Sequence, residues 1–148
     1  MKKVIWISII VVALVAFLAF RPDSKAKAIV VTDAGLTATD KVEVYYFHFS
    51  RRCVTCIAVE NKTQEAVVAL YPEAYRKGKI TFASVNLEDE KSKPLAEKAK
   101  VTGQALVILS GDFRKDLTAE GFMYANNNFD KFKAEIQKTI DPLIKEMK

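Results

Sequence analysis

The chain has 148 residues, half of them hydrophobic and 28% charged, which favours one folded domain and excludes global disorder and low complexity. Two cysteines exclude a disulfide-rich scaffold, and one histidine cannot by itself supply a histidine-based metal site. Residues 1–28 carry +4 of the formal net charge of +5, so residues 29–148 are nearly neutral at +1. Nucleic acid is therefore not expected as a partner, because phosphate binding needs clustered positive charge.

An apolar segment lies close to the first residue. Two lysines precede seventeen uncharged, mostly apolar residues, 4–20, which as a helix span about 26 Å, near the lower limit for crossing a membrane. We expect residues 1–21 to form a hydrophobic helix that is a membrane anchor, or a signal peptide cleaved after Ala28, with the retained anchor favoured. Residues 22–40 are expected to be a tether. The signal-like start places the following domain outside the cytoplasm, or secretes it if the segment is cleaved.

Residues 41–148 alternate strand-like and helix-like segments. Composition and spacing predict a buried strand, a long helix, a second strand, a short exposed helix, an apolar central strand, a strand returning antiparallel and an amphipathic helix capped by asparagine. In chain order these cover residues 42–49, 53–71, 80–87, 88–100, 105–109, 118–124 and 129–147. The order β-α-β-α-β-β-α predicts an α/β domain with a parallel pair of strands, a mixed central sheet and helices on both faces.

Two cysteines lie where the first predicted strand meets the first helix. Cys53 and Cys56 are three residues apart, which at a helix start places both sulfurs on one side of the first turn, close enough for a disulfide. The unpaired N–H groups of the helix, with Arg51 and Arg52 just before it, favour a thiolate at Cys53. A loop this short stabilises a fold little, so the pattern favours a reactive dithiol in which Cys53 attacks and Cys56 resolves.

With this placement, residues 42–148 resemble a minimal thioredoxin-fold domain that lacks the leading strand and helix of thioredoxin itself. The stretches FHFSRRCVTC, ITFASVNLEDE and ALVIL most resemble the thioredoxin-like family labelled as a nitrophenyl compound nitroreductase subunit, of the arsenic-cluster ArsF type. The resemblance implies a thioredoxin-like domain over residues 41–148, a redox-active disulfide in place of any other cofactor, and a subunit role. No flavin or nicotinamide fingerprint is present, so the residues do not support reduction of a nitro group.

Two positions depart from the thioredoxin pattern. Arg52 replaces the tryptophan that usually precedes the first cysteine, and Ala105 stands in place of the cis-proline in the loop opposite the dithiol. A cis peptide bond before a residue other than proline costs about 3 kcal/mol, so we expect a trans bond at Ala105. The substrate groove should then differ in shape, and the dithiol should be less crowded against metal ions.

Three functions remain open at the level of sequence. The first is a membrane-tethered thiol–disulfide oxidoreductase or redox relay subunit that acts on a partner protein's dithiol or disulfide, with residues 4–20 in the membrane. The second is an accessory subunit that binds a soft ion, such as arsenite, copper or zinc, on the two cysteines. The third is a scaffold subunit with a vestigial dithiol.

Two further residues are candidates for supporting roles. His48 shares a strand face with Tyr46 and is a candidate metal ligand or proton shuttle, although a core-edge histidine bonded to backbone is the simpler interpretation. Glu60, one helical turn after Cys56, is a candidate proton relay to the deeper thiol, or a surface carboxylate without such a role.

Overall fold

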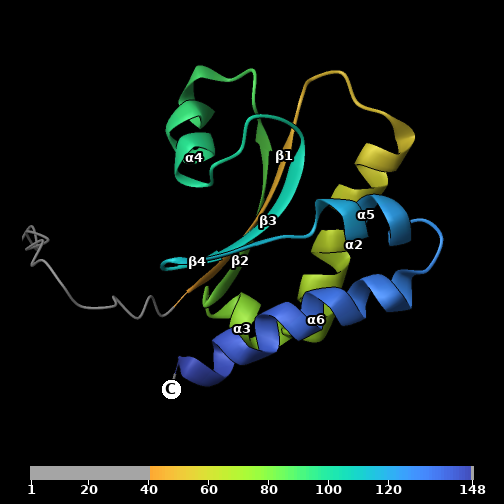
Figure 1. The fold of residues 1–148 in the computed structure, drawn as a ribbon. Helices are drawn as coiled ribbons and strands as arrows, with labels where there is room; N and C mark the ends of the chain where they lie inside the picture. The colour runs from red at the N-terminus through yellow and green to blue at the C-terminus, as the bar shows by residue number, and fades with distance from the viewer. Residues whose placement is uncertain (1–40, 148) are drawn as a thin grey trace, which may run out of the picture. The chain divides into compact units, whose positions relative to one another are not determined.

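A computed structural model describes residues 41–147, which form an α/β fold around a four-stranded sheet in the order β2-β1-β3-β4 (Figure 1). Strand β1 is parallel to β2 and antiparallel to β3, and β4 is antiparallel to β3, so the predicted mixed sheet is confirmed. The elements are β1 (Val42–His48), α2 (Val54–Leu70), α3 (Pro72–Arg76), β2 (Ile80–Asn86), η1 (Glu90–Ser92), α4 (Lys93–Lys98), β3 (Ala105–Ser110), β4 (Phe113–Asp116), α5 (Thr118–Tyr124) and α6 (Phe129–Glu146).

The N-terminal predictions fall outside this range. The anchor or signal peptide at residues 1–21 and the tether at residues 22–40 are not among the described residues and stay predictions. Within residues 41–147, none of the helices combines the length and the apolar character needed to span a bilayer.

The sheet separates two hydrophobic clusters. Val44 and Tyr46 of β1 belong to the larger cluster, with buried side chains of α2 and α6, whereas Phe47 packs on the opposite face with α4. This alternation is the one expected of a strand, and it places β1 between the two clusters, with one face buried and the other partly buried. Helices α2, α3, α5 and α6 lie on one side of the sheet and α4 on the other, so the predicted coverage of both faces is confirmed (Figure 1).

The final helix illustrates how local sequence sets an element. The side chain of Asn128 accepts a hydrogen bond from the backbone N–H of Lys131 at 3.1 Å, which confirms the predicted cap of α6. Four apolar side chains then face the core at helical spacing: Phe132, Ile136, Ile140 and Leu143. The predicted exposed helix at residues 88–100 is realised as the short turn η1 followed by α4.

The prediction of a strand over residues 118–124 is wrong, because this segment is the helix α5. Strand β3 turns back at once: Ser110 pairs with Phe113, and Gly111 in the turn has a positive φ of 56°. The antiparallel strand is therefore β4, whose four residues are all exposed and so give no apolar pattern to recognise. In α5, Gly121 packs closely on α2: a Cβ there would lie 3.0 Å from Val59 Cγ1, so the valine side chain would have to move by a few tenths of an ångström.

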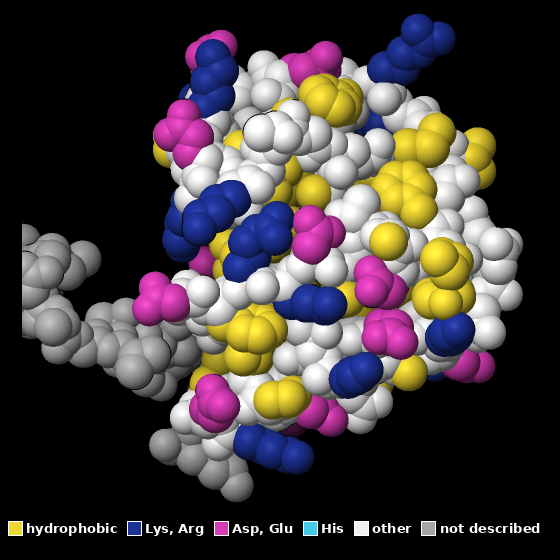
Figure 2. Space-filling model, viewed as in Figure 1, with side chains coloured by type: hydrophobic (Ala, Val, Ile, Leu, Met, Phe, Trp, Pro, Cys, Tyr) yellow, Lys and Arg dark blue, Asp and Glu magenta, His cyan; other side chains and the backbone are white. Residues whose placement is uncertain are grey.

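Charge is dispersed over the face drawn in Figure 2. Lysine and arginine side chains alternate there with aspartate and glutamate, and apolar side chains are exposed between them. The large apolar side chains that are more than a third exposed are Phe49, Val54, Ile57, Val68, Phe113 and Met123.

Replacing Phe132 by alanine should destabilise the domain by about 3–5 kcal/mol, because the ring is fully buried and its removal leaves a cavity. The matched control is Val68→Ala on α2, where the side chain is 40% exposed and the expected change is below about 0.5 kcal/mol. Urea unfolding followed by circular dichroism measures both changes. Equal unfolding midpoints for the two variants would contradict this description of the core.

Candidate functional site

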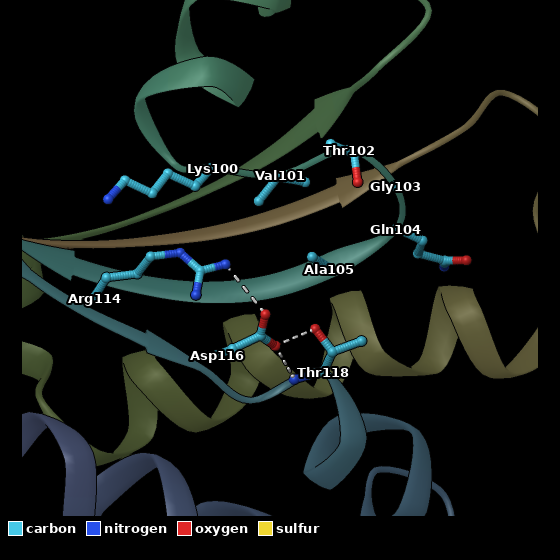
Figure 3. Close-up of a pocket in the computed structure, with 9 residues that line it drawn as sticks. All are labelled: Lys100, Val101, Thr102, Gly103, Gln104, Ala105, Arg114, Asp116 and Thr118. Carbon is cyan, nitrogen blue, oxygen red and sulfur yellow. Dashed lines mark hydrogen bonds and ion pairs between the residues drawn. The ribbon is translucent and has the colours of Figure 1, made fainter.

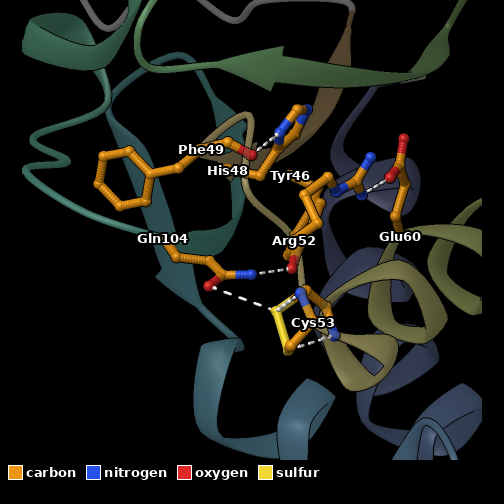
Figure 4. The surroundings of a disulfide bond; sticks show 8 residues. Tyr46, His48, Phe49, Arg52, Cys53, Glu60 and Gln104 are labelled. Carbon is orange, nitrogen blue, oxygen red and sulfur yellow. Dashed lines mark hydrogen bonds and ion pairs between the residues drawn. A yellow bond between two sulfur atoms is a disulfide. The ribbon is translucent and has the colours of Figure 1, made fainter.

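The two cysteines form a disulfide at the start of α2 (Figure 4), with the sulfurs 2.10 Å apart and the Cα atoms 5.0 Å apart. Cys53 is the N-cap residue of the helix, and its Sγ accepts a hydrogen bond from the backbone N–H of Cys56 at 3.1 Å. In return, Cys56 Sγ accepts from the backbone N–H of Cys53 at 3.2 Å. Two of the otherwise unpaired N–H groups at this helix end are thus satisfied by sulfur. The predicted position of the dithiol at the strand–helix junction is confirmed.

The two sulfurs differ in access to solvent. Cys53 is exposed, whereas Cys56 is only 6% exposed and points into the protein. A thiolate or disulfide from another molecule can therefore approach Cys53 but not Cys56. This difference in access is what the predicted attacking and resolving roles require.

The arginine pair is arranged differently from the sequence expectation. Arg52 forms an ion pair with Glu60, and its guanidinium carbon lies 5.9 Å from the centre of the Tyr46 ring (Figure 4). The positive charge of Arg52 is thus shared with a carboxylate, and the described contacts do not aim it at Cys53. Arg51 is exposed. Water screens its charge, so its effect on the sulfur is small.

Glu60 and His48 each have a defined partner. The carboxylate of Glu60 faces Arg52, and none of its hydrogen bonds among residues 41–147 reaches Cys56. His48 Nδ1 donates to the backbone carbonyl of Phe49 at 2.9 Å, and its ring stacks on Tyr46 at 6.1 Å between centroids. His48 therefore has the backbone-bonded position of a core-edge histidine. Across the described part of the chain, no three His, Cys, Asp or Glu side chains are grouped to hold a metal ion.

Sequence reasoning missed the side chain that contacts the disulfide, which is Gln104. Its Nε2 donates a hydrogen bond to the hydroxyl of Tyr46, and its Oε1 lies 3.7 Å from Cys56 Sγ (Figure 4). Ala105, the next residue, is buried and pairs with Phe47 of β1, and every peptide bond within residues 41–147 is trans, as expected at Ala105. The signal available for Gln104 was its place beside Ala105, in the loop that the thioredoxin resemblance puts opposite the dithiol.

A polar hollow of about 330 Å³ extends from Gln104 toward the β4 edge (Figure 3). Two of its charged groups pair with each other: Arg114 Nη2 lies 3.2 Å from Asp116 Oδ2, and Arg114 Nε also donates to the carbonyl of Ala99 at 2.7 Å. Burial acts to raise the pKa of Asp116, but the hydrogen bonds from Thr118 and the Arg114 charge hold it below its usual value. The lining residues are Lys100, Val101, Thr102, Gly103, Gln104, Ala105, Arg114, Asp116 and Thr118.

Comparison with known proteins assigns no family to the chain. No family model matches it, and no curated protein matches it. Among solved structures, one described as the structure of a malarial protein is 22% identical and covers 64% of this chain and 96% of its own, with a TM-score of 0.39. A likeness at that score carries no argument about fold or function.

In the reduced full-length protein, Cys53 should react with iodoacetamide on the order of tenfold or more faster than Cys56, because Cys53 is exposed and Cys56 is buried. Timed alkylation at neutral pH, digestion and mass spectrometry measure the two rates. Cys53→Ser and Cys56→Ser serve as a matched pair that reports each thiol alone. Equal rates for the two thiols would contradict the difference in access.

Proposed function

We propose that this protein is a membrane-tethered thiol–disulfide oxidoreductase or redox relay subunit that exchanges disulfides with a partner protein through Cys53 and Cys56. The observation that carries the proposal is the disulfide at the N-terminus of α2, in which one sulfur is exposed and the other is buried. A disulfide that closes so short a loop contributes little to stability, so exchange chemistry is the better account of its presence.

We further propose that residues 41–148 are a minimal thioredoxin-like domain of the ArsF type, placed outside the cytoplasm. Support comes from the parallel β1 and β2, the antiparallel β3 and β4, and the dithiol directly after β1. A disulfide persists most readily in an oxidising compartment, which agrees with the anchor or signal peptide expected from residues 4–20.

The exchange balances as two displacements at sulfur. A partner thiolate attacks Cys53 Sγ, the Cys53–Cys56 bond breaks, and Cys56 Sγ leaves with the electron pair and takes up a proton. The partner's second thiolate then attacks the partner sulfur of the mixed disulfide and releases Cys53 as a thiolate. The partner dithiol loses two electrons and the Cys53–Cys56 pair gains them. In the opposite direction, Cys53 attacks a partner disulfide and Cys56 resolves the intermediate.

Exposed apolar side chains close to Cys53 and Cys56 in the sequence suit a polypeptide partner. Phe49 in the loop after β1 and Ile57 in the first turns of α2 are 42% and 44% exposed, and Val54, beside Cys53, is 82% exposed. Apolar side chains grouped around a reactive group are typical of a protein contact surface. They would hold a partner chain while its sulfur reacts.

Redox titration of the full-length protein against dithiothreitol and glutathione buffers tests the proposal, with thiol content followed by mass spectrometry. We expect a reversible two-electron transition between roughly −120 and −270 mV. The less negative end of this range would make the protein an oxidant of its partners, and the more negative end an electron donor. Cys56→Ser should accumulate a mixed disulfide with glutathione and Cys53→Ser should not, because only Cys53 is accessible.

A dithiol that does not cycle would overturn the exchange mechanism. The same samples would then be titrated with arsenite and with copper(I), since paired thiolates bind soft ions. If the dithiol neither cycles nor binds these ions, the third function, a scaffold subunit with a vestigial dithiol, is the one that remains.

A further inference from the structure

The Gln104 amide links the disulfide to a fixed point in the core. Its Nε2 donates to the Tyr46 hydroxyl, so its carbonyl Oε1 is the atom that turns toward Cys56, at 3.7 Å from the sulfur (Figure 4). Gln104 precedes β3 directly, and Ala105 is held in the sheet opposite Phe47. The amide is therefore anchored through both its backbone and its side chain.

Tyr46 is a rigid partner for this amide. It is fully buried in the larger hydrophobic cluster, and its ring is stacked with His48 and lies beside the Arg52 guanidinium. Burial raises the pKa of Tyr46, while the Gln104 hydrogen bond and the Arg52 charge act in the opposite direction. Since the net shift is upward, the hydroxyl is neutral at physiological pH and remains available to the amide.

The polar groups around the two sulfurs differ. Cys53 Sγ receives a backbone N–H and is exposed to water, both of which favour a negative charge on sulfur. Cys56 Sγ also receives a backbone N–H, but it is buried and faces the oxygen of an amide. A carbonyl oxygen can accept a hydrogen bond from a thiol and repels a thiolate.

Charged groups of the surrounding elements do not reverse this difference. The residues around the disulfide include Cys53 and Arg52 of the loop before α2, Glu60 of α2, and Tyr46 and His48 of β1 (Figure 4). Arg52 and Glu60 pair with each other, and His48 is bonded to the Phe49 carbonyl. On the side of Gln104, Asp116 is bonded to Thr118 and Arg114.

We propose that Gln104 is a positioning residue of the dithiol: once the disulfide is reduced, its Oε1 accepts the S–H of Cys56, so that Cys56 keeps the proton and Cys53 carries the negative charge. The proposal rests on the proposed function, in which Cys53 must be the attacking sulfur. Tyr46 contributes by holding the amide in this orientation. When Cys53 becomes bonded to a partner, the Cys56 proton must leave before Cys56 can attack, so the Gln104 contact also delays resolution.

A pH titration of the Cys56 thiol in the full-length Cys53→Ser protein tests the role of Gln104. The ultraviolet absorbance of the thiolate monitors the ionisation. Only one thiol then ionises, so its pKa is assigned without ambiguity. Adding Tyr46→Phe frees the amide to turn its N–H₂ group toward the sulfur and should lower the Cys56 pKa by about one unit, a tenfold rise in the thiolate fraction well below that pKa. Adding Gln104→Glu should raise the pKa instead, because a carboxylate repels the thiolate.

The matched control is Tyr45→Phe, which removes a neighbouring hydroxyl that donates to Glu43 and has no contact with the site. It should leave the Cys56 pKa unchanged. The proposal is overturned if Tyr46→Phe leaves the pKa where it was, if Tyr45→Phe shifts it equally, or if Gln104→Glu does not raise it. The titration requires no disulfide exchange with a partner. It therefore tests the contact between Gln104 and Cys56 even if the dithiol does not cycle between its oxidised and reduced forms.

Discussion

The hydrogen bond from the backbone N–H of Cys56 to the sulfur of Cys53 joins the fold of this protein to its chemistry. It caps α2, a 17-residue helix on the main face of the sheet, and it places an electropositive N–H group against the sulfur of the exposed Cys53. The cap depends on β1, which contributes buried side chains to both hydrophobic clusters and ends at His48, five residues before Cys53. Because β1 cannot shift without disturbing both hydrophobic clusters, the sulfur is held at one place relative to the core.

Tyr46 extends this constraint to the groups behind the disulfide. Its ring is buried in the core, and its hydroxyl accepts a hydrogen bond from Gln104, whose side chain lies beside the buried Cys56. The guanidinium of Arg52 lies over the face of the same ring. The polarity felt by the sulfurs therefore comes chiefly from backbone N–H groups and one amide. Because these dipoles are fixed by the fold, they need little reorientation when the disulfide is reduced or re-formed. The charge of Arg52 contributes less, since it is largely balanced by Glu60.

Much of the fold was predictable because its elements have strong local patterns. β1 and β3 are rich in β-branched and aromatic or aliphatic residues, and α6 has both an asparagine cap and an apolar face. Strand β4 was missed because Arg114, Lys115 and Asp116 lie on an exposed sheet edge, where pairing with β3 makes the strand without any burial. The turn at residues 110–112 predicts a strand that returns antiparallel, but β4 is the strand that pairs with β3, and residues 118–124 form α5. The close packing of α5 on α2, where Gly121 faces Val59, is a tertiary contact that the local sequence does not show.

For the candidate site, the sequence by itself determined that two cysteines stand three residues apart at the end of a buried strand, and that His48 and Tyr46 share a face. These are short-range relations that follow from strand alternation and helix geometry. The resemblance places the loop around Ala105 opposite the dithiol, but only the tertiary structure decided that the side chain of Gln104 contacts Cys56, 48 residues away. It also decided that Arg52 pairs with Glu60 and lies beside Tyr46. The contact of Gln104 depends on how β3 pairs with β1. Contacts of this kind join residues far apart in the chain, so the local sequence around a polar side chain does not show which partner it will have.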